Sequence, residues 1–103
     1  MPNTKNITPI LRLYNSYLKP VPVPYPKPLH EFMTTFGISS SRLYYRTCQR
    51  RSVYSLFLEV KQFSALENFF RVNEIFNRHF GGVNFRDHIT CVEVSFYLKN
   101  END

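Results

Sequence analysis

The chain has 103 residues, with 13 Lys or Arg against 8 Asp or Glu, so its formal net charge is +5 and its pI is about 9.4. This length predicts one domain with a modest core, and 43% hydrophobic residues exclude a wholly disordered chain. No run of residues approaches the roughly 18 apolar residues that span a bilayer. The basic balance favours an anionic partner, such as a nucleic acid or an acidic surface.

The N-terminal third is rich in proline. All seven prolines lie in the first 28 residues, and residues 19–28 (KPVPVPYPKP) alternate proline almost strictly. Proline fixes φ and has no N–H, so this segment is predicted to be extended. We interpret residues 20–42 as an extended arm and loop lying on a partner; a polyproline ligand for an aromatic groove is the alternative. Residues 7–19 fit either a short strand or a helix.

The middle of the chain has β character. Residues 30–36 (HEFMTTF) are predicted to form a strand that ends at Gly37. A β-rich run follows from residue 42 to residue 60, as a hairpin turning at QRRS or as one bent strand. Its second part alternates with a period of two, which predicts one buried face. One face carries Tyr54, Leu56, Leu58 and Val60, and the other carries Val53, Ser55, Phe57 and Glu59.

One long helix is predicted over residues 64–80. Ser64 and Glu67 match a capping box, an apolar stripe follows, and Gly81 and Gly82 would end the helix. Residues 88–98 (HITCVEVSFYL) alternate as a final strand, and residues 99–103 are expected to be a loose tail. The order of elements predicts a single α+β domain over residues 1–103. Its expected fold is a ferredoxin-like sandwich of about four strands with one or two helices on one face.

Few residues indicate catalysis or metal binding. The three histidines and two cysteines lack the spacing of a metal site, and no glycine-rich phosphate loop is present. Cys48 and Cys91 are interpreted as reduced, half-buried thiols, with a disulfide as the alternative. We therefore expect no enzyme activity, no metal, no cofactor and no small-molecule substrate.

The stretch SRLYYRTCQRR, residues 41–51, concentrates arginine and tyrosine, and no acid lies between Glu31 and Glu59 to offset it. A planar guanidinium binds phosphate with two hydrogen bonds, and tyrosine rings stack on unpaired bases. On an extended strand Arg42, Arg46 and Arg50 would share one face. The stretch and two flanking lysines are therefore predicted to bind RNA. The predicted RNA-binding residues are Lys19, Lys27, Arg42, Tyr44, Tyr45, Arg46, Arg50 and Arg51.

Three segments carry a resemblance to a known family. They are PVPYP (residues 22–26) followed by Phe-Met-Thr (residues 32–34), RTCQR (residues 46–50) and CVEVSF (residues 91–96). In this order they resemble the ribosomal protein S-ten (NusE-type) family, in which a proline loop enters a strand with Phe-Thr-Val. An Arg-Thr-His-Lys-Arg strand and a last strand such as Gly-Val-Asp-Val-Glu-Ile follow in that family. The resemblance covers about residues 20–98 with gaps, and the family's Ser-Pro-His is replaced by GISSS.

The resemblance implies a structural constituent of the small ribosomal subunit. Such a protein would bind ribosomal RNA in the subunit head and contact neighbouring proteins, which in the family include S-three, S-nine and S-fourteen. Ten Phe, seven Tyr and nine Asn with no Trp fit an AT-rich genome, so a mitochondrion-encoded member in the matrix is expected. Three alternatives remain: an S-six-like ribosomal protein, a subunit of an organelle membrane complex, and a small viral nucleic-acid-binding protein.

Overall fold

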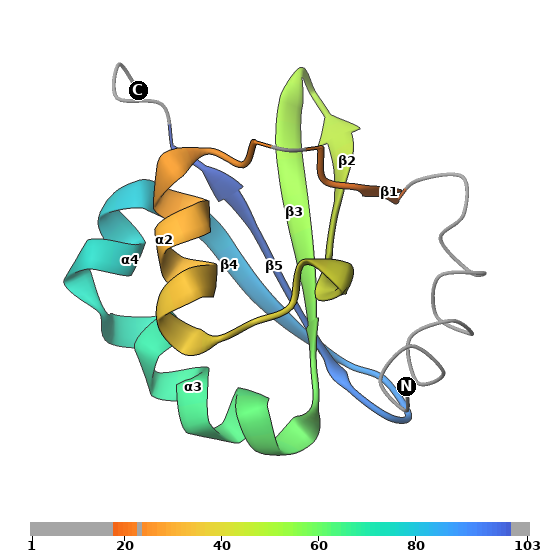
Figure 1. Ribbon diagram of the computed structural model, residues 1–103, viewed down its shortest axis with the longest axis vertical. Coiled ribbons are helices and arrows are strands. Elements are labelled where there is room, and N and C mark those ends of the chain that lie inside the picture. Colours follow the sequence, from red (N-terminus) through yellow and green to blue (C-terminus); the bar gives the residue numbers. More distant parts are fainter. Residues whose placement is uncertain (1–17, 23, 100–103) are drawn as a thin grey trace.

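The computed structural model describes residues 18–22 and 24–99, in which one antiparallel sheet is covered on one face by helices (Figure 1). The strands lie in the order β1-β2-β3-β5-β4. Their bounds are β1 Lys19–Pro20, β2 Leu43–Cys48, β3 Arg51–Leu58, β4 Phe80–Asp87 and β5 Val92–Leu98. The helices are α2 Lys27–Phe36, α3 Val60–Val72 and α4 Glu74–His79, and Ser40–Arg42 forms a 3-10 turn. The α+β sandwich is confirmed, with one strand and one helix more than expected.

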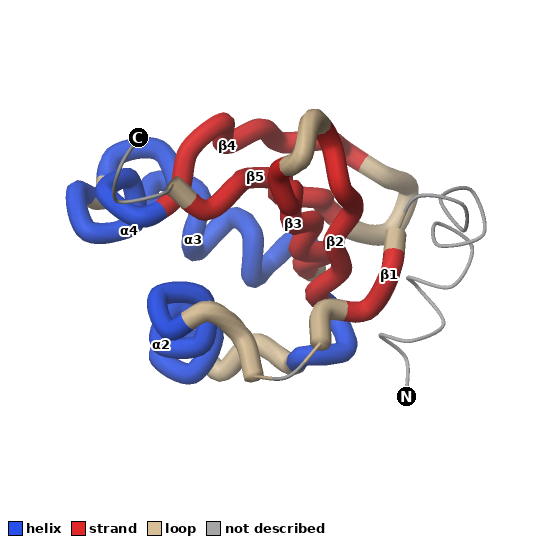
Figure 2. The backbone as a smooth tube through the Cα atoms, turned by 90° about the horizontal axis from the view of Figure 1, so that it is seen from above, coloured by secondary structure: helices blue, strands red, loops and turns tan. Residues whose placement is uncertain are grey.

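The core lies between the helices and the sheet. Figure 2 shows α2, α3 and α4 on the same side of the strands. Phe32 of α2, Phe70 of α3 and Phe76 of α4 form a cluster of rings with centroids 5.3–5.7 Å apart. From the sheet, Leu56, Val94 and Phe96 close this core and are at most 1% exposed. The side chains of β3 alternate in direction as predicted up to Leu58, after which the chain enters α3. The prediction of a single buried face is wrong for this strand, because Ser55 and Phe57 on the opposite face are at most 1% exposed.

The strand predicted over residues 30–36 is wrong, because this segment is helix α2. Pro28 lies in the first turn, where a missing N–H costs no hydrogen bond. Leu29, Phe32 and Met33 then share a face, and all three are buried against the core. Gly37 ends the helix with a left-handed φ of 63°, and the Ile38 N–H bonds the Met33 carbonyl oxygen at 2.9 Å. Burial of one helical face outweighs the β propensity of the individual residues.

This helix also corrects the prediction of an extended arm over residues 20–42. Lys19 and Pro20 form the short edge strand β1, a position that proline tolerates. The chain is without regular structure at residues 21–22 and 24–26, and α2 begins at Lys27. Of the resemblance segments, residues 32–34 are thus helical where the family has a strand.

The helix predicted over residues 64–80 is two helices that meet at Asn73. The Asn73 Oδ1 accepts a hydrogen bond from the Phe76 N–H at 2.9 Å and so caps α4. The predicted capping box is wrong, because α3 begins at Val60 and Ser64 lies inside it. Glu67 instead pairs with Arg71 one turn later, at 2.9 Å.

Strand β4 was not predicted, and it contains the two glycines that were assigned to a helix end. Gly82 has a left-handed φ of 61°. A Cβ atom built on Gly82 would lie 2.6 Å from the Tyr97 ring, and one on Gly81 would lie 2.7 Å from the Tyr97 hydroxyl. The glycines are therefore needed for close approach of the Tyr97 side chain to the strand.

The final strand is shorter than predicted. Residues 88–91 form a turn in which the His88 N–H bonds the Cys91 carbonyl oxygen at 2.9 Å. The strand begins at Val92. Of the strand or helix expected within residues 7–19, only Leu18 and Lys19 are described, and Lys19 belongs to β1. Residues 7–17 and the end of the tail, residues 100–103, lie outside the described residues.

Candidate nucleic-acid interface

The arginine-rich stretch folds as the β2–β3 hairpin, which decides between the two alternatives left by the sequence. Cys48 pairs with Arg51, and Gln49 and Arg50 form the two-residue turn. All seven residues from 46 to 52 are exposed. The hairpin extends beyond the ends of the helices in Figure 1. The stretch therefore places its charge at a projecting end of the sheet.

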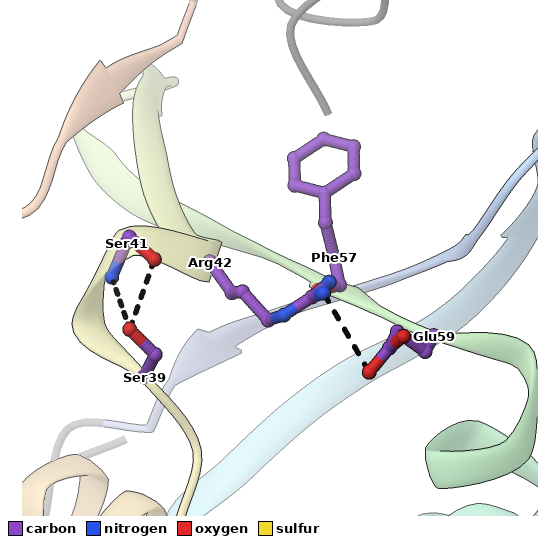
Figure 3. A network of polar contacts seen from close by, with 5 residues as sticks. All are labelled: Ser39, Ser41, Arg42, Phe57 and Glu59. Carbon is purple, nitrogen blue, oxygen red and sulfur yellow. Dashed lines mark hydrogen bonds and ion pairs between the residues drawn. The ribbon is translucent and has the colours of Figure 1, made fainter. Parts of the chain in front are cut away.

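Arg42 does not belong to this exposed charge. Its side chain is 4% exposed, and Nη1 donates a 2.7 Å hydrogen bond to the Phe57 carbonyl oxygen (Figure 3). Its Nη2 lies 3.9 Å from a carboxylate oxygen of Glu59. The 3-10 turn, in which the Ser41 N–H bonds the Ser39 Oγ at 3.2 Å, directs Arg42 inward before β2 begins. Arg42 thus anchors the loop after α2 to the end of β3.

The predicted row of Arg42, Arg46 and Arg50 is therefore wrong. Only Arg46 lies within β2, and Arg50 lies in the turn. The period-two argument assumed one extended strand from residue 42 to residue 50, whereas the chain enters the strand at Leu43 and leaves it after Cys48. The exposed group that remains is Arg46, Arg50 and Arg51.

Tyr44 and Tyr45 point to opposite faces, as predicted from strand alternation. Tyr45 packs against the helix-side core. Tyr44 lies on the other face with its ring centroid 6.1 Å from that of Phe57, and burial raises the pKa of its hydroxyl. Both rings thus contribute to packing, and the tip of the hairpin, residues 46–52, contains no aromatic residue.

The face of the sheet opposite the helices carries polar groups that the sequence did not reveal as a cluster. The Ser55 Oγ donates a 2.9 Å hydrogen bond to Glu93 Oε2, and His88 Nε2 lies 2.9 Å from Glu93 Oε1. A pocket of about 340 Å³ lies beside Ser55 and Glu93, and the residues that line it include Arg46 and Arg86. A pocket of similar volume on the helix side, about 350 Å³, is lined mainly by aromatic side chains. Arg86 lies in the unpredicted strand β4, opposite Glu93, so no sequence signal placed it here.

The Ser55, Glu93 and His88 cluster differs from a nucleophilic triad. In a triad the imidazole accepts the hydroxyl proton and the carboxylate orients the imidazole. Here the carboxylate stands between the two, and the serine hydroxyl donates to it directly. The cluster therefore satisfies a carboxylate whose side chain is only 10% exposed, as a buried charge requires.

Arg51 stacks on the ring of Tyr97, with Cζ 4.2 Å from the ring centroid. The close approach of Tyr97 to Gly81 and Gly82 brings this ring against β4. The stack therefore links the hairpin, β5 and β4, and it fixes the direction of the Arg51 side chain.

The two predicted lysines lie apart from the hairpin tip in the chain. Lys19 is an exposed residue of β1, opposite Tyr45 of β2. Lys27 is the first residue of α2 and is exposed. Lys19 thus extends the sheet edge beside β2, and Lys27 adds charge at the start of a helix.

The cysteines are both free, and neither is half-buried as predicted. Cys48 is exposed at the end of β2, and Cys91 is buried before β5. Burial raises the pKa of the Cys91 thiol, which keeps it in the unreactive protonated form. Within residues 18–22 and 24–99, no three His, Cys, Asp or Glu side chains are grouped to hold a metal ion.

None of the helices described is both long and apolar enough to cross a membrane. No protein-family model matches the chain, and comparisons with curated proteins and with solved structures return no similar protein.

Proposed function

We propose that this chain binds RNA through the β2–β3 hairpin, as a constituent of the small ribosomal subunit of a mitochondrion. The observation that carries RNA binding is the grouping of Arg46, Arg50 and Arg51 at the exposed end of the hairpin. Arginine forms charge-assisted hydrogen bonds with phosphate and keeps its charge at every physiological pH.

The distribution of acids supports this surface. Glu31 and Glu67 lie in helices, Glu74 begins α4, and Glu59 immediately precedes α3. Asp87 of β4 and Glu93 of β5 lie toward the end of the sheet opposite the hairpin turn. The hairpin contains no acid, because none occurs between residues 31 and 59. The hairpin end of the molecule is therefore the part of the described chain most favourable to a polyanion.

The ribosomal assignment rests on the sequence. RTCQR (residues 46–50) covers most of the exposed end of the hairpin, and CVEVSF (residues 91–96) covers Cys91 and the first five residues of β5. Both resemble segments of the S-ten family. The expected neighbours are ribosomal RNA and other small-subunit proteins, and the composition supports a mitochondrial source.

RNA binding is tested by the salt dependence of affinity. Replacing Arg46 and Arg50 by Ala should weaken binding to RNA of any sequence and reduce the slope of log K against log salt by about one to two units. The matched control replaces Lys61 and Arg78, exposed residues of α3 and α4, by Ala. The control makes the same change in net charge. Equal slopes in the two double variants would contradict binding through the hairpin.

The ribosomal assignment needs a separate measurement. The tagged protein should sediment with small ribosomal subunits at high salt in mitochondrial extracts. Recovery with detergent-solubilised membranes would favour the membrane-complex alternative. A free protein that binds RNA would favour the viral type of nucleic-acid-binding protein.

A further inference from the structure

We propose that the tip of the β2–β3 hairpin binds double-stranded RNA, and that its two turn residues are kept in strained conformations for that contact. The inference rests on the proposed RNA binding and specifies the class of RNA and the residues that meet it. It concerns residues 46–52, all of which are exposed.

The turn residues are not those that its geometry favours. Gln49 has a φ of 52° and Arg50 a φ of 66°, the only positive values at non-glycine residues among those described. A two-residue hairpin turn with positive φ at both central positions strongly prefers Asn-Gly. Left-handed backbone is strained at an ordinary residue, because its Cβ lies too close to the following carbonyl oxygen. Stability alone would therefore favour Asn-Gly at this turn, and strain of this kind is typical of functional sites.

The chemistry of the tip fits a duplex. Residues 46–52 (RTCQRRS) supply three guanidinium groups, one amide and two hydroxyls, and they supply no ring. The rings beside the tip are already in contact with other side chains: Tyr44 packs on Phe57, Tyr45 packs against the helix-side core, and Tyr97 is stacked by Arg51 of the tip itself. Recognition of single-stranded RNA depends on stacking of unpaired bases, whereas duplex RNA is bound through phosphates and 2′-hydroxyls. The tip offers partners for the second mode.

The shape of the hairpin agrees with this partner. Two paired strands are about 5 Å apart, and the wide, shallow minor groove of duplex RNA presents its 2′-hydroxyls at the surface. Arg46 lies on one face of the ribbon, Arg50 in its turn, and Arg51 at the start of the returning strand. This arrangement allows guanidinium groups to reach backbone phosphates while Gln49 meets the groove.

The test replaces Gln49 by Asn and Arg50 by Gly in the full chain. The double variant should unfold at a higher denaturant concentration, because the strain is relieved. It should bind a 16-base-pair RNA duplex at least about 5-fold more weakly and show a salt slope smaller by about one unit. Arg78→Ala, which removes one charge from α4, should leave duplex affinity within about 2-fold of the parent. Arg50→Lys, which keeps the charge, should weaken duplex binding without raising stability.

The outcomes separate the inference from the proposed function. If the parent binds neither duplex nor single-stranded RNA, the proposed function itself is overturned. If the parent binds RNA but the Asn-Gly variant binds the duplex equally well, only the inference is overturned. The same holds if single-stranded RNA of the same sequence binds more tightly than the duplex, or if the Asn-Gly variant is no more stable than the parent.

Discussion

The two faces of the sheet use the same strands for different purposes. On the helix side, Phe76 has ring neighbours on α2, α3, β4 and β5, at centroid distances of 4.7–5.7 Å. On the other side, Ser55 of β3 donates a hydrogen bond to Glu93 of β5, and Arg46 of β2 is exposed. A smaller apolar cluster, Leu18, Phe57 and Cys91, is also buried on that side. Because side chains alternate along a strand, the chain can build a core on one face and leave a charged ribbon at its end. This comparison predicts that substitutions in the aromatic core lower the free energy of unfolding, whereas substitutions of exposed arginines in the hairpin change RNA binding.

The largest effect is expected in the aromatic core. Phe76→Ala should lower the free energy of unfolding by about 3–5 kcal/mol, because the side chain is 2% exposed and its removal leaves a cavity. Phe70→Ala, at a fully buried ring, should behave alike. Chemical denaturation measures both. A loss below about 1 kcal/mol at both positions would mean that the helices do not cover this face as described.

The second prediction compares two arginines from the same stretch. Arg42→Met keeps an apolar stem but removes the donor to the Phe57 carbonyl, and should cost about 1.5–3 kcal/mol, as for hydrogen bonds of charged groups. Arg46→Ala should change stability by less than about 0.5 kcal/mol, because the residue is exposed.

RNA binding should show the reverse order for these two arginines. Arg46→Ala reduces the salt slope, and Arg42→Met leaves it unchanged in protein that remains folded. If Arg42→Met and Arg46→Ala lowered the free energy of unfolding equally, the assignment of Arg42 to the fold and of Arg46 to RNA binding would be contradicted.

The last comparison is between Gly82, which allows Tyr97 to lie against β4, and Gly37, which ends α2. Gly37→Ala introduces a strained φ of 63° with no atom within 4 Å of the new Cβ, so it should cost about 1–2 kcal/mol. Gly82→Ala has a similar φ of 61° but also meets the Tyr97 ring. Gly82→Ala should therefore lower the free energy of unfolding by more than Gly37→Ala does, and the excess is the cost of the contact with Tyr97.

The measurement is the difference between the losses in free energy of unfolding that Gly82→Ala and Gly37→Ala cause. In a Tyr97→Ala background the contact is gone, so Gly82→Ala and Gly37→Ala should then cost the same. A persistent difference in that background would show that Tyr97 is not the reason for glycine at position 82.

Local patterns predicted those elements whose periodicity agrees with their burial. The alternation in residues 53–58 and 92–98 gave two central strands, and their inward faces are Tyr54, Leu56, Val94 and Phe96 as expected. The apolar stripe of residues 66–80 was assigned to one helix, and Leu66, Phe70 and Phe76 are buried in α3 and α4. Two other members differ from the prediction, because Ile75 is 65% exposed and Phe80 lies in β4. The same reasoning failed for residues 30–36, because seven residues are too few to distinguish the period of a strand from that of a helix. This segment is a helix in the structure, and one of its faces packs against α3 and α4.

The candidate site was only partly predictable for a related reason. The sequence located the arginines, yet Arg42 and Arg46 differ in role because one precedes the strand and bonds to β3, while the other lies on the strand's outer face. No local pattern marks which arginine will meet a carbonyl 15 residues away. Likewise, Arg86 and Glu93 became neighbours through the pairing of β4 with β5, which depends on the two glycines fitting Tyr97.

The sequence by itself determined three properties of this protein. It is small and basic, its strands and helices each carry an apolar face, and one arginine-rich stretch contains no acid. These follow from residue type and spacing, which are local. The tertiary structure decided that the stretch turns at Gln49 and Arg50, that Arg42 is buried, and that Asn73 divides the helix. The burial of Arg42 depends on a contact with Phe57, 15 residues away, which the preferences of single residues for helix or strand do not reveal. The turn and the Asn73 cap use local contacts, but the strand pairing and the ring packing on either side of them join separate elements.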